Sequence, residues 1–415
     1  MSHTERLAAL TRLLAEWHWL WSPTPFTHAS IPWSDRAQAG DIAACLEALD
    51  DQRCQRLQQR PFDDSPLAAW LPVAELKRLI DVAPGPPAID APEAWASHVG
   101  GRKWAQMLAF APQVEQLRGQ RLVEWCAGKG HLSRLLARWH HGPVRALEWQ
   151  PALCRSGQAL ADHQGLEVSL VEQDVMQPGA AEQLDHADQV VALHACGDLH
   201  VRLLQLARDK RVAVTLAPCC YQRTRDERYR PLSAQARYQA EQHDLALDRE
   251  TLAMAVQETV TASRGEQRKR ERANAWRLGF DELQRELRGT DDYLAVPSLA
   301  YGQMPDDFAG FCRWAAREKG LALPKGVDWE AFERRGVARL GRVNRFELVR
   351  HLFRRPLELW LVLDRALWLE EAGFEVRLSE FCERALTPRN LALVATPQRQ
   401  PDRAQSPTAA LDRRR

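Results

Sequence analysis

The segment that decides the fold of this chain is RLVEWCAGKGHLS, residues 121–133. Residues 122–125 are apolar or compatible with a strand, and leucines resume at helical spacing from Leu132 onward. Between these two parts, Gly128 and Gly130 mark a tight turn. The pattern predicts a strand, a glycine turn and a helix. Such a turn lets the backbone approach a ligand closely, and the helix N-terminus offers unpaired N–H groups to polar oxygens.

Two features near this turn qualify the prediction. Glu124 lies on the strand just before the turn, where its carboxylate can accept hydrogen bonds from a cationic or hydroxyl-bearing ligand. Cys126, Gly128 and Gly130 stand at the positions of a G-x-G-x-G loop, but the first glycine is replaced by Cys126. The dinucleotide fingerprint G-x-G-x-x-G therefore does not fit. Taken alone, the loop is equally compatible with a purely structural turn.

Polar residues also follow the next two predicted strands. The apolar run 144–147 ends in Glu148, a position suited to binding ribose hydroxyls. Residues 166–171 read as a third strand, and Asp174 follows it, where it can accept a hydrogen bond from an adenine amino group. In an open parallel sheet, ligands bind at the carboxyl ends of the strands. These carboxylates are therefore predicted to line one ligand site.

A fourth and a fifth strand end in further polar motifs. Residues 190–193 lead into HACGDL, residues 194–199, and residues 212–217 lead into PCCY, residues 218–221. The same edge of the sheet should therefore carry a histidine, an aspartate, a tyrosine and three cysteines. These are the candidate groups for chemistry.

Together these segments resemble the class I S-adenosylmethionine-dependent methyltransferases, and more narrowly the methyltransferase domain 32 family, whose members share KGHLS, CGDL and CCY segments. Residues 387–393, TPRNLAL, resemble another segment of that family, and GRKW at 101–104 loosely matches a lysine-containing one. The likeness covers about residues 95–225 and 356–397. It implies a Rossmann-like α/β fold with a mostly parallel sheet of seven strands. It also implies S-adenosyl-L-methionine as the cofactor, with the binding residues Glu124, Cys126, Gly128, Gly130, His131, Leu132, Glu148, Asp174 and His194.

The fourth and fifth strands adjoin the reactive end of the cofactor in this sheet order. Methyl transfer from a sulfonium is a direct displacement in which the protein supplies alignment and a proton acceptor. His194 could be a base near neutral pH, or it could only contact the cofactor. The candidate catalytic residues are His194, Cys196, Asp198, Cys219, Cys220 and Tyr221.

Two other roles for the cysteines remain open. A thiolate could attack a pyrimidine before methylation, although Pro218-Cys219-Cys220 departs from the pyrimidine-methylating motifs. Zinc could be bound by His194, Cys196, Cys219 and Cys220. Adjacent cysteines rarely share one metal, and the chain has no C-x-x-C pair, so the sequence predicts no metal.

At 415 residues, the chain exceeds one typical domain. Helices are predicted over 4–21, 41–57, 67–80 and 232–287, and a further helix from Pro356 to a stop at Gly373. Trp17, Trp19 and Trp21 are interpreted as core, rather than as a base-stacking platform. The predicted parts are an N-terminal helical domain 1–92, core strands 93–221, a helical and partly basic insertion 222–355, a closing helix with two strands 356–397, and a disordered tail 398–415.

Charge and cysteine usage limit the partners. The chain has 56 basic and 55 acidic side chains, so its overall charge does not indicate a nucleic-acid or membrane partner. The segment from Arg313 to Arg355 is locally basic and is the candidate phosphate-binding surface, although a solvated surface explains it as well. Nine cysteines without a C-x-x-C pair are typical of a reducing compartment. With no apolar run of about 18 residues and no signal core, we expect a cytoplasmic protein.

These observations lead to three hypotheses. The first is a methyltransferase that acts on RNA, with tRNA as one candidate, because a related eukaryotic group methylates tRNA riboses. The second keeps the enzyme but assigns it a protein or small-molecule acceptor, which the even net charge favours. The third is a non-catalytic scaffold that binds the cofactor. The sequence assigns no acceptor atom and no oligomeric state.

Overall fold

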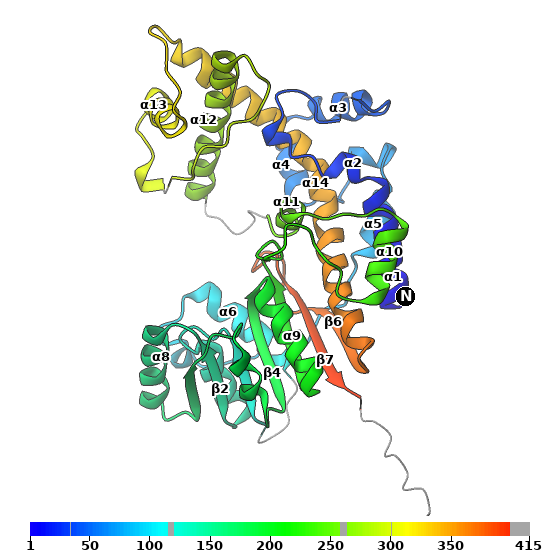
Figure 1. Cartoon of the computed structure of the whole chain (residues 1–415), viewed down its shortest axis with the longest axis vertical. Helices are drawn as coiled ribbons and strands as arrows, with labels where there is room; N and C mark the ends of the chain where they lie inside the picture. The colour runs from blue at the N-terminus through cyan, green and yellow to red at the C-terminus, as the bar shows by residue number, and fades with distance from the viewer. Residues whose placement is uncertain (34, 115–119, 258–263, 300, 399–415) are drawn as a thin grey trace, which may run out of the picture.

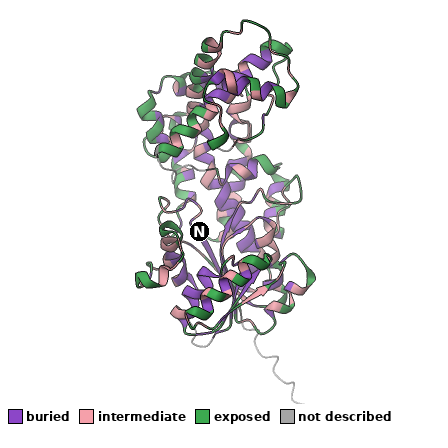
Figure 2. Ribbon diagram, turned by 90° about the vertical axis from the view of Figure 1, so that its left-hand side faces the viewer, coloured by how far each residue is buried: buried purple, intermediate pink, exposed green. Residues whose placement is uncertain are grey.

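The chain is described here from a computed structural model, which covers residues 1–33, 35–114, 120–257, 264–299 and 301–398. The molecule is elongated, with a sheet domain at one end and a helical group at the other (Figure 1). One helix of 42 residues, α14 (Trp329–Glu370), runs from the helical group down to the sheet. Buried residues follow the same path, from the strands along α14 to the far helices (Figure 2).

Seven strands form one sheet in the order β3-β2-β1-β4-β5-β7-β6. Strand β7 is antiparallel to both of its neighbours, and the pairs among β1 to β5 are parallel. This confirms the predicted Rossmann-like α/β fold with a mostly parallel sheet of seven strands. The strands are β1 (Leu122–Trp125), β2 (Val144–Glu148), β3 (Val168–Glu172), β4 (Gln189–Cys196), β5 (Ala213–Cys219), β6 (Phe374–Glu380) and β7 (Leu391–Pro397).

Helices cover both faces of the sheet, which explains why the central strands read as continuous apolar runs. Leucines of α9 pack on one face together with Ala366 and Leu369 from the last turns of α14. The other face is covered by α6, α7 and α8, which contribute Phe110, Leu135 and Ala161. These helices are α6 (Gly101–Phe110), α7 (His131–His140), α8 (Pro151–His163) and α9 (Asp198–Lys210).

The N-terminal helices are shorter than the sequence predicts. The predicted helix 41–57 is broken because the side chain of Asp50 accepts a hydrogen bond from Arg53 N–H (2.7 Å) and starts a new helix. The predicted helix 67–80 begins only at Val73, after a 3-10 turn and Pro72. The helices are α1 (His3–Glu16), α2 (His18–Trp21), α3 (Ala39–Glu47), α4 (Asp51–Gln59) and α5 (Val73–Leu79).

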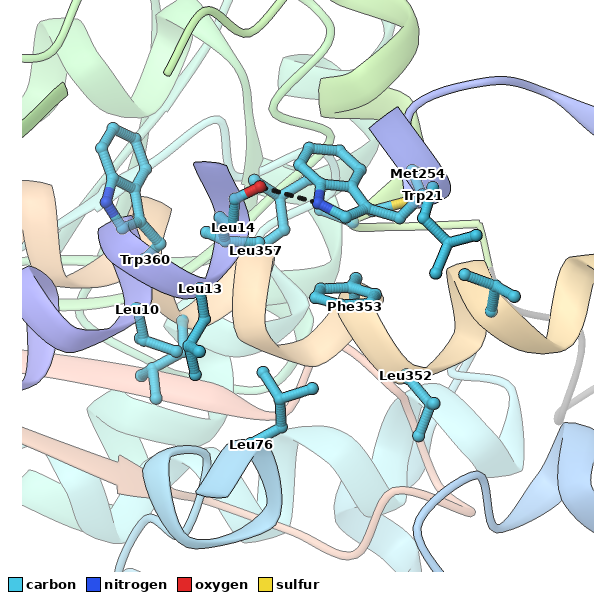
Figure 3. Close-up of a cluster of buried hydrophobic side chains, with 14 of the residues drawn as sticks. Leu10, Leu13, Leu14, Trp21, Leu76, Met254, Leu352, Phe353, Leu357 and Trp360 are labelled. Atoms are coloured by element: carbon cyan, nitrogen blue, oxygen red, sulfur yellow. Dashed lines mark hydrogen bonds between the residues drawn. The ribbon is translucent and has the colours of Figure 1, made fainter. Parts of the chain in front are cut away.

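These helices share one hydrophobic core with α14 (Figure 3). Trp21 is fully buried, its ring stacks 6.1 Å from that of Phe353 on α14, and its Nε1–H donates to Leu14 O (2.9 Å). Trp360 Nε1–H donates to Thr11 Oγ1 (2.8 Å) on α1. The core interpretation therefore holds for Trp21, whereas the other two tryptophans of that run are only partly buried.

The insertion after β5 contains several helices where the sequence predicts one over 232–287. A capping box between Asp248 and Thr251 begins a new helix there. Helices α12 and α14 approach closely because both carry glycine at the contact: a Cβ on Gly336 would lie 2.6 Å from the nitrogen of Gly279. The helices are α10 (Ala234–Gln242), α11 (Arg249–Met254), α12 (Arg264–Arg288) and α13 (Phe308–Lys319).

The predicted boundary between residues 355 and 356 is wrong, because α14 continues through Pro356. Proline removes one backbone donor and costs roughly 3 kcal/mol inside a helix. Here Phe353, Leu357 and Leu361 are fully buried on either side of it, and this burial offsets the cost. Gly373, with a φ of 76°, follows the helix as predicted. None of the described helices is long and apolar enough to cross a membrane, and the predicted tail beyond residue 398 lies outside the described residues.

Candidate active site

A pocket of about 260 Å³ opens at the carboxyl ends of β1, β2 and β3. Three predicted cofactor residues, Cys126, Glu148 and Asp174, line it. The sequence analysis missed Trp149, which also lines the pocket and is 65% exposed. The sequence did offer a signal for Trp149, because this bulky aromatic residue directly follows the carboxylate Glu148 at a strand end. The other lining residues are Leu147, Gln173, Val175 and Leu199.

The glycine turn adopts a left-handed backbone at three alternate positions. The φ angles are 57° at Cys126, 61° at Gly128 and 61° at Gly130. Cys126 thus adopts the conformation for which glycine is usual, which explains why the loop keeps its form without the first glycine. Glu148 holds the loop, since its Oε2 accepts from Gly128 N–H (3.0 Å) and its Oε1 from Gln150 N–H (2.9 Å).

Gly157, in the middle of α8, was also missed. A Cβ at this position would lie 2.8 Å from Lys129 O in the glycine turn and 2.4 Å from Leu170 Cδ2. Helix α8 therefore packs against the turn only because this residue has no side chain. A glycine inside an otherwise regular helical pattern was the signal that could have found it.

Glu124 is buried beneath the turn. Its Oε2 accepts hydrogen bonds from the backbone N–H (2.8 Å) and the hydroxyl of Ser133, which ties β1 to the first turn of α7. Burial raises the pKa of Glu124 to about 7, although the bonds from Ser133 and the charge of Lys103 oppose the shift. Burial, Lys103 and Arg134 lower the pKa of His131 to about 4. The side chain of Leu132 packs in the core and does not line the pocket.

The raised pKa of Glu124 leads to a pH prediction. A cation beside a carboxylate lowers the pKa of that carboxylate, so binding of a cofactor with a protonated amino group should release a proton from Glu124 below pH 7. We expect the affinity to rise between about pH 5 and 7, where the amino group stays charged, and to level off above 7. Calorimetry over this range tests the prediction. The Glu124→Gln variant should show a flat profile, and an equal slope in both proteins would contradict the assignment.

His194 lies where β4 is interrupted by a register shift, and its φ is 63°. Its Nε2 lies 3.1 Å from Gln106 Oε1 on α6, a partner that the sequence analysis missed. Its Nδ1 is buried and has no hydrogen-bond partner among the described residues. Burial and the charge of Arg389 lower the pKa of His194 to about 4. Such a weakly basic imidazole is a poor proton acceptor near neutral pH, which favours the alternative that His194 only contacts the ligand.

Asp198 binds backbone groups of the loop that follows β5. Its Oδ2 accepts from Arg225 N–H (2.8 Å), and its own N–H donates to Arg223 O (3.0 Å). The close approach of the turn between β4 and α9 to the loop after β5 needs Gly197, because a Cβ there would lie 1.9 Å from Arg223 O. The CGDL segment therefore joins the start of α9 to the loop after β5. The structure thus gives Asp198 a positioning role, and its predicted catalytic role stays a prediction.

Tyr221 does not face the cleft as predicted. It is 2% exposed, its ring lies 5.9 Å from that of His200, and the guanidinium of Arg365 lies 4.9 Å from its ring centroid. The reason is the left-handed backbone of Cys220, with a φ of 48°, after which the chain turns into the core between α9 and α14. The alternation of side chains between the two faces of a strand does not predict the left-handed turn at Cys220.

The three predicted cysteines at this edge do meet. The sulfurs of Cys196 and Cys219 lie 3.6 Å apart, and with that of Cys220 all three lie within 4.8 Å of one another. Cys219 is buried, and the other two are half-buried. Hydrogen bonds with the other two thiols, together with Arg389 and Arg223, hold the pKa of Cys220 well below its usual value.

Many arginines of the basic segment between Arg313 and Arg355 pair with carboxylates, and the predicted phosphate binding by this segment stays a prediction. Arg339 pairs with Asp281 (2.8 Å) and Glu282 (2.9 Å) on α12, and Arg345 pairs with Asp51 (2.8 Å). Arg350 and Arg354 pair with Glu347, and Arg355 pairs with Glu358 and Glu380. Arg339 and Arg345 thus tie α14 to neighbouring helices, whereas Arg350 and Arg354 pair within α14. A charge count along the sequence cannot show these partners.

Two other arginines lie beside the thiols. Arg223 and Arg389 both act on the charge of Cys220. Among the residues that the structure describes, no carboxylate forms an ion pair with either of them. The edge at β4 and β5 therefore carries two arginines without an ion-pair partner among the described residues, whereas the pocket at β2 and β3 carries two carboxylates.

Comparison with known proteins agrees with this geometry. The sequence model of the methyltransferase domain 32 family, described as a methyltransferase domain, matches residues 102–227. No curated protein sequence matches the chain. Among solved structures, a coclaurine N-methyltransferase bound to N-methylheliamine and SAH is 13% identical, with 44% of this chain and 63% of that chain covered and a TM-score of 0.25. A putative sarcosine dimethylglycine methyltransferase from Galdieria sulphuraria is 16% identical, with 38% of this chain and 59% of that chain covered and a TM-score of 0.22. A geranyl diphosphate methyltransferase in complex with GPP and sinefungin is 16% identical, with 39% of this chain and 65% of that chain covered and a TM-score of 0.24.

This chain thus spans less than two thirds of the length of each of these three structures. The family match covers the glycine turn, the strand-end carboxylates and the CGDL and CCY segments, and it supports S-adenosyl-L-methionine as the cofactor. The sheet order agrees with the seven-stranded sheet that the resemblance implies. Residues 102–227 of this chain match the methyltransferase domain model of this family, and they lie within a mostly parallel sheet of seven strands.

Proposed function

We propose that this chain transfers a methyl group by direct displacement from S-adenosyl-L-methionine to an anionic acceptor, and that the acceptor is RNA. The observation that carries the proposal is the division of one sheet edge into two parts. Carboxylates and an aromatic ring surround a pocket at β2 and β3, and arginines and thiols lie at β4 and β5. A cofactor and an acceptor need such adjoining but chemically different sites.

The residues of the pocket fit the cofactor. Leu147, Val175 and Leu199 offer apolar contact to a base, and Trp149 offers an exposed ring beside them. Glu148 is already oriented by two backbone N–H groups, and its remaining lone pairs can accept from ribose hydroxyls. The bound cofactor supplies an electrophilic methyl group on a sulfonium. Asp174 also lines the pocket and offers a further acceptor for the cofactor's polar groups.

The acceptor side favours negative charge. Arg223 and Arg389 raise the local potential beside Cys220, and positive potential concentrates anionic ligands. The neutral His194 can contact the acceptor through its unpartnered Nδ1, and it does not need to titrate to do so. RNA is an anionic polymer, and its binding to arginines is steeply salt-dependent. Protein and small-molecule acceptors remain the competing classes.

A transfer assay tests the proposal. Protein is incubated with radiolabelled cofactor and with RNA, protein and metabolite fractions at two salt concentrations. We expect label in RNA, less label at higher salt, and a loss of roughly tenfold in Arg389→Glu, because one charged contact is worth about 1.5 kcal/mol or more. The matched control is Arg377→Glu, an exposed arginine on the edge strand β6.

Each other outcome rejects a defined part of the proposal. Label only in protein or metabolites rejects RNA and supports the competing acceptor classes. An absence of label in every fraction, with cofactor binding intact by calorimetry, rejects catalysis and supports the scaffold hypothesis. An equal loss in Arg389→Glu and Arg377→Glu rejects the role assigned to the charged cleft.

A further inference from the structure

The spacing of the three thiols at the ends of β4 and β5 matches the geometry of a metal site. Zinc binds thiolate sulfur at about 2.3 Å in tetrahedral geometry, which places two sulfurs about 3.8 Å apart. Cys196 and Cys219 have their sulfurs 3.6 Å apart, and all three sulfurs lie within 4.8 Å of one another. The group is therefore close to the arrangement that an ion would need.

The backbone removes the main objection to this site, which is that adjacent cysteines diverge. In an extended strand, neighbouring side chains point to opposite faces. Cys196 and Cys219 are register partners on parallel strands, so their side chains share one face. Cys220 has a φ of 48°, and this left-handed turn brings its thiol back to the same group. A non-glycine residue held in this conformation is strained, and such strain occurs often at functional sites.

We propose that Cys196, Cys219 and Cys220 bind a zinc ion through three thiolates, with the fourth coordination position open to the acceptor side of the cleft. Three protein ligands with one open position are typical of catalytic rather than structural zinc sites. His194 is not a ligand, because its ring nitrogens do not belong to the group of mutually close atoms.

The charges around the thiols agree with the proposal. Three thiolates and one Zn²⁺ carry a net charge of −1, and Arg223 and Arg389 supply positive charge next to Cys220. The main alternative is a disulfide between Cys196 and Cys219. Their sulfurs would have to close from 3.6 Å to the bonded distance of about 2.05 Å. The zinc proposal does not depend on methyl transfer, so it can hold or fail independently of the proposed function.

The first experiment measures metal content. Full-length protein is purified under reducing conditions, incubated with Zn²⁺, desalted and analysed by plasma mass spectrometry. We expect about one zinc per chain in the wild type and in the control Cys382→Ser, a half-buried thiol outside the group. The double variant Cys196→Ser/Cys220→Ser should lose at least about tenfold in bound zinc, with circular dichroism confirming that it is folded.

A second experiment needs no variant. Zinc should protect the three cysteines of the group from alkylation, mapped by peptide mass spectrometry, and leave the half-buried Cys45 equally reactive with and without the ion. Wild-type protein that retains no more zinc than the double variant overturns the proposal. Alkylation of the three thiols that zinc does not change also overturns it. A Cys196–Cys219 disulfide that persists in reducing buffer would favour the alternative.

Discussion

Replacing Glu148 with alanine is expected to weaken the binding of S-adenosyl-L-methionine roughly 100-fold. The carboxylate lines the cofactor pocket and is held by Gly128 N–H (3.0 Å) and Gln150 N–H (2.9 Å). Two hydrogen bonds from ribose hydroxyls to a charged acceptor are worth about 1.5 kcal/mol each, and a total of about 3 kcal/mol corresponds to about 100-fold. Isothermal titration calorimetry measures the dissociation constant directly.

The matched control for this prediction is Glu172→Ala. Glu172 is the register partner of Glu148 on β3, but its side chain is exposed and does not line the pocket. We expect its dissociation constant to stay within about twofold of the wild type, since a surface carboxylate contributes little to a site it does not contact. Equal losses in the two variants would show a general electrostatic effect. Unchanged binding in Glu148→Ala would contradict the assignment of this pocket as the S-adenosyl-L-methionine site.

The second large effect is expected on stability, at Asp364 on α14. This fully buried carboxylate accepts hydrogen bonds from Tyr229 Oη–H (2.5 Å), Leu232 N–H (2.8 Å) and both the N–H and the hydroxyl of Ser233 (2.8 Å each). It fastens the start of the insertion to the central helix. Asp364→Ala leaves these donors buried without an acceptor, so the free energy of unfolding should fall by about 4 kcal/mol. Urea denaturation followed by circular dichroism measures the change.

An exposed carboxylate nearby provides the comparison. Glu371 accepts from Ala234 N–H (3.0 Å) and Gln235 N–H (3.1 Å) at the start of α10. Because water can replace this acceptor, Glu371→Ala should cost no more than about 1 kcal/mol. If the two substitutions cost the same, burial is not what makes Asp364 important.

Local patterns predicted much of the sheet domain and the cofactor pocket. The strand, glycine turn and helix at 121–133 form as expected, and Glu148 and Asp174 lie at one sheet edge. These features depend on hydrophobic periodicity and on the rule that parallel strands end at the same edge, and both are readable from neighbouring residues. Trp149 was missed because an exposed aromatic side chain leaves no periodic signal.

The helical parts were predicted less well, because distant contacts override local propensity. Pro356 predicts a helix start, yet α14 continues through it. The helix persists because residues before and after the proline are buried in the core. The segment from Arg313 to Arg355 was predicted as a candidate phosphate-binding surface, and most of its arginines on α14 pair with carboxylates on other elements. Counting charges along the sequence gives the number of arginines but does not show which carboxylates they pair with.

By itself, the sequence determined the order of the strands' polar ends, the glycine turn and the family that these motifs resemble, because each is written in contiguous residues. Only the tertiary structure decided which of those polar groups face one another. It placed Asp198 on backbone groups and Tyr221 in the core, and it gathered Cys196, Cys219 and Cys220. The reason is that single left-handed residues, such as Cys220, redirect the chain, and their conformation is set by the packing around them and not by their own side chains.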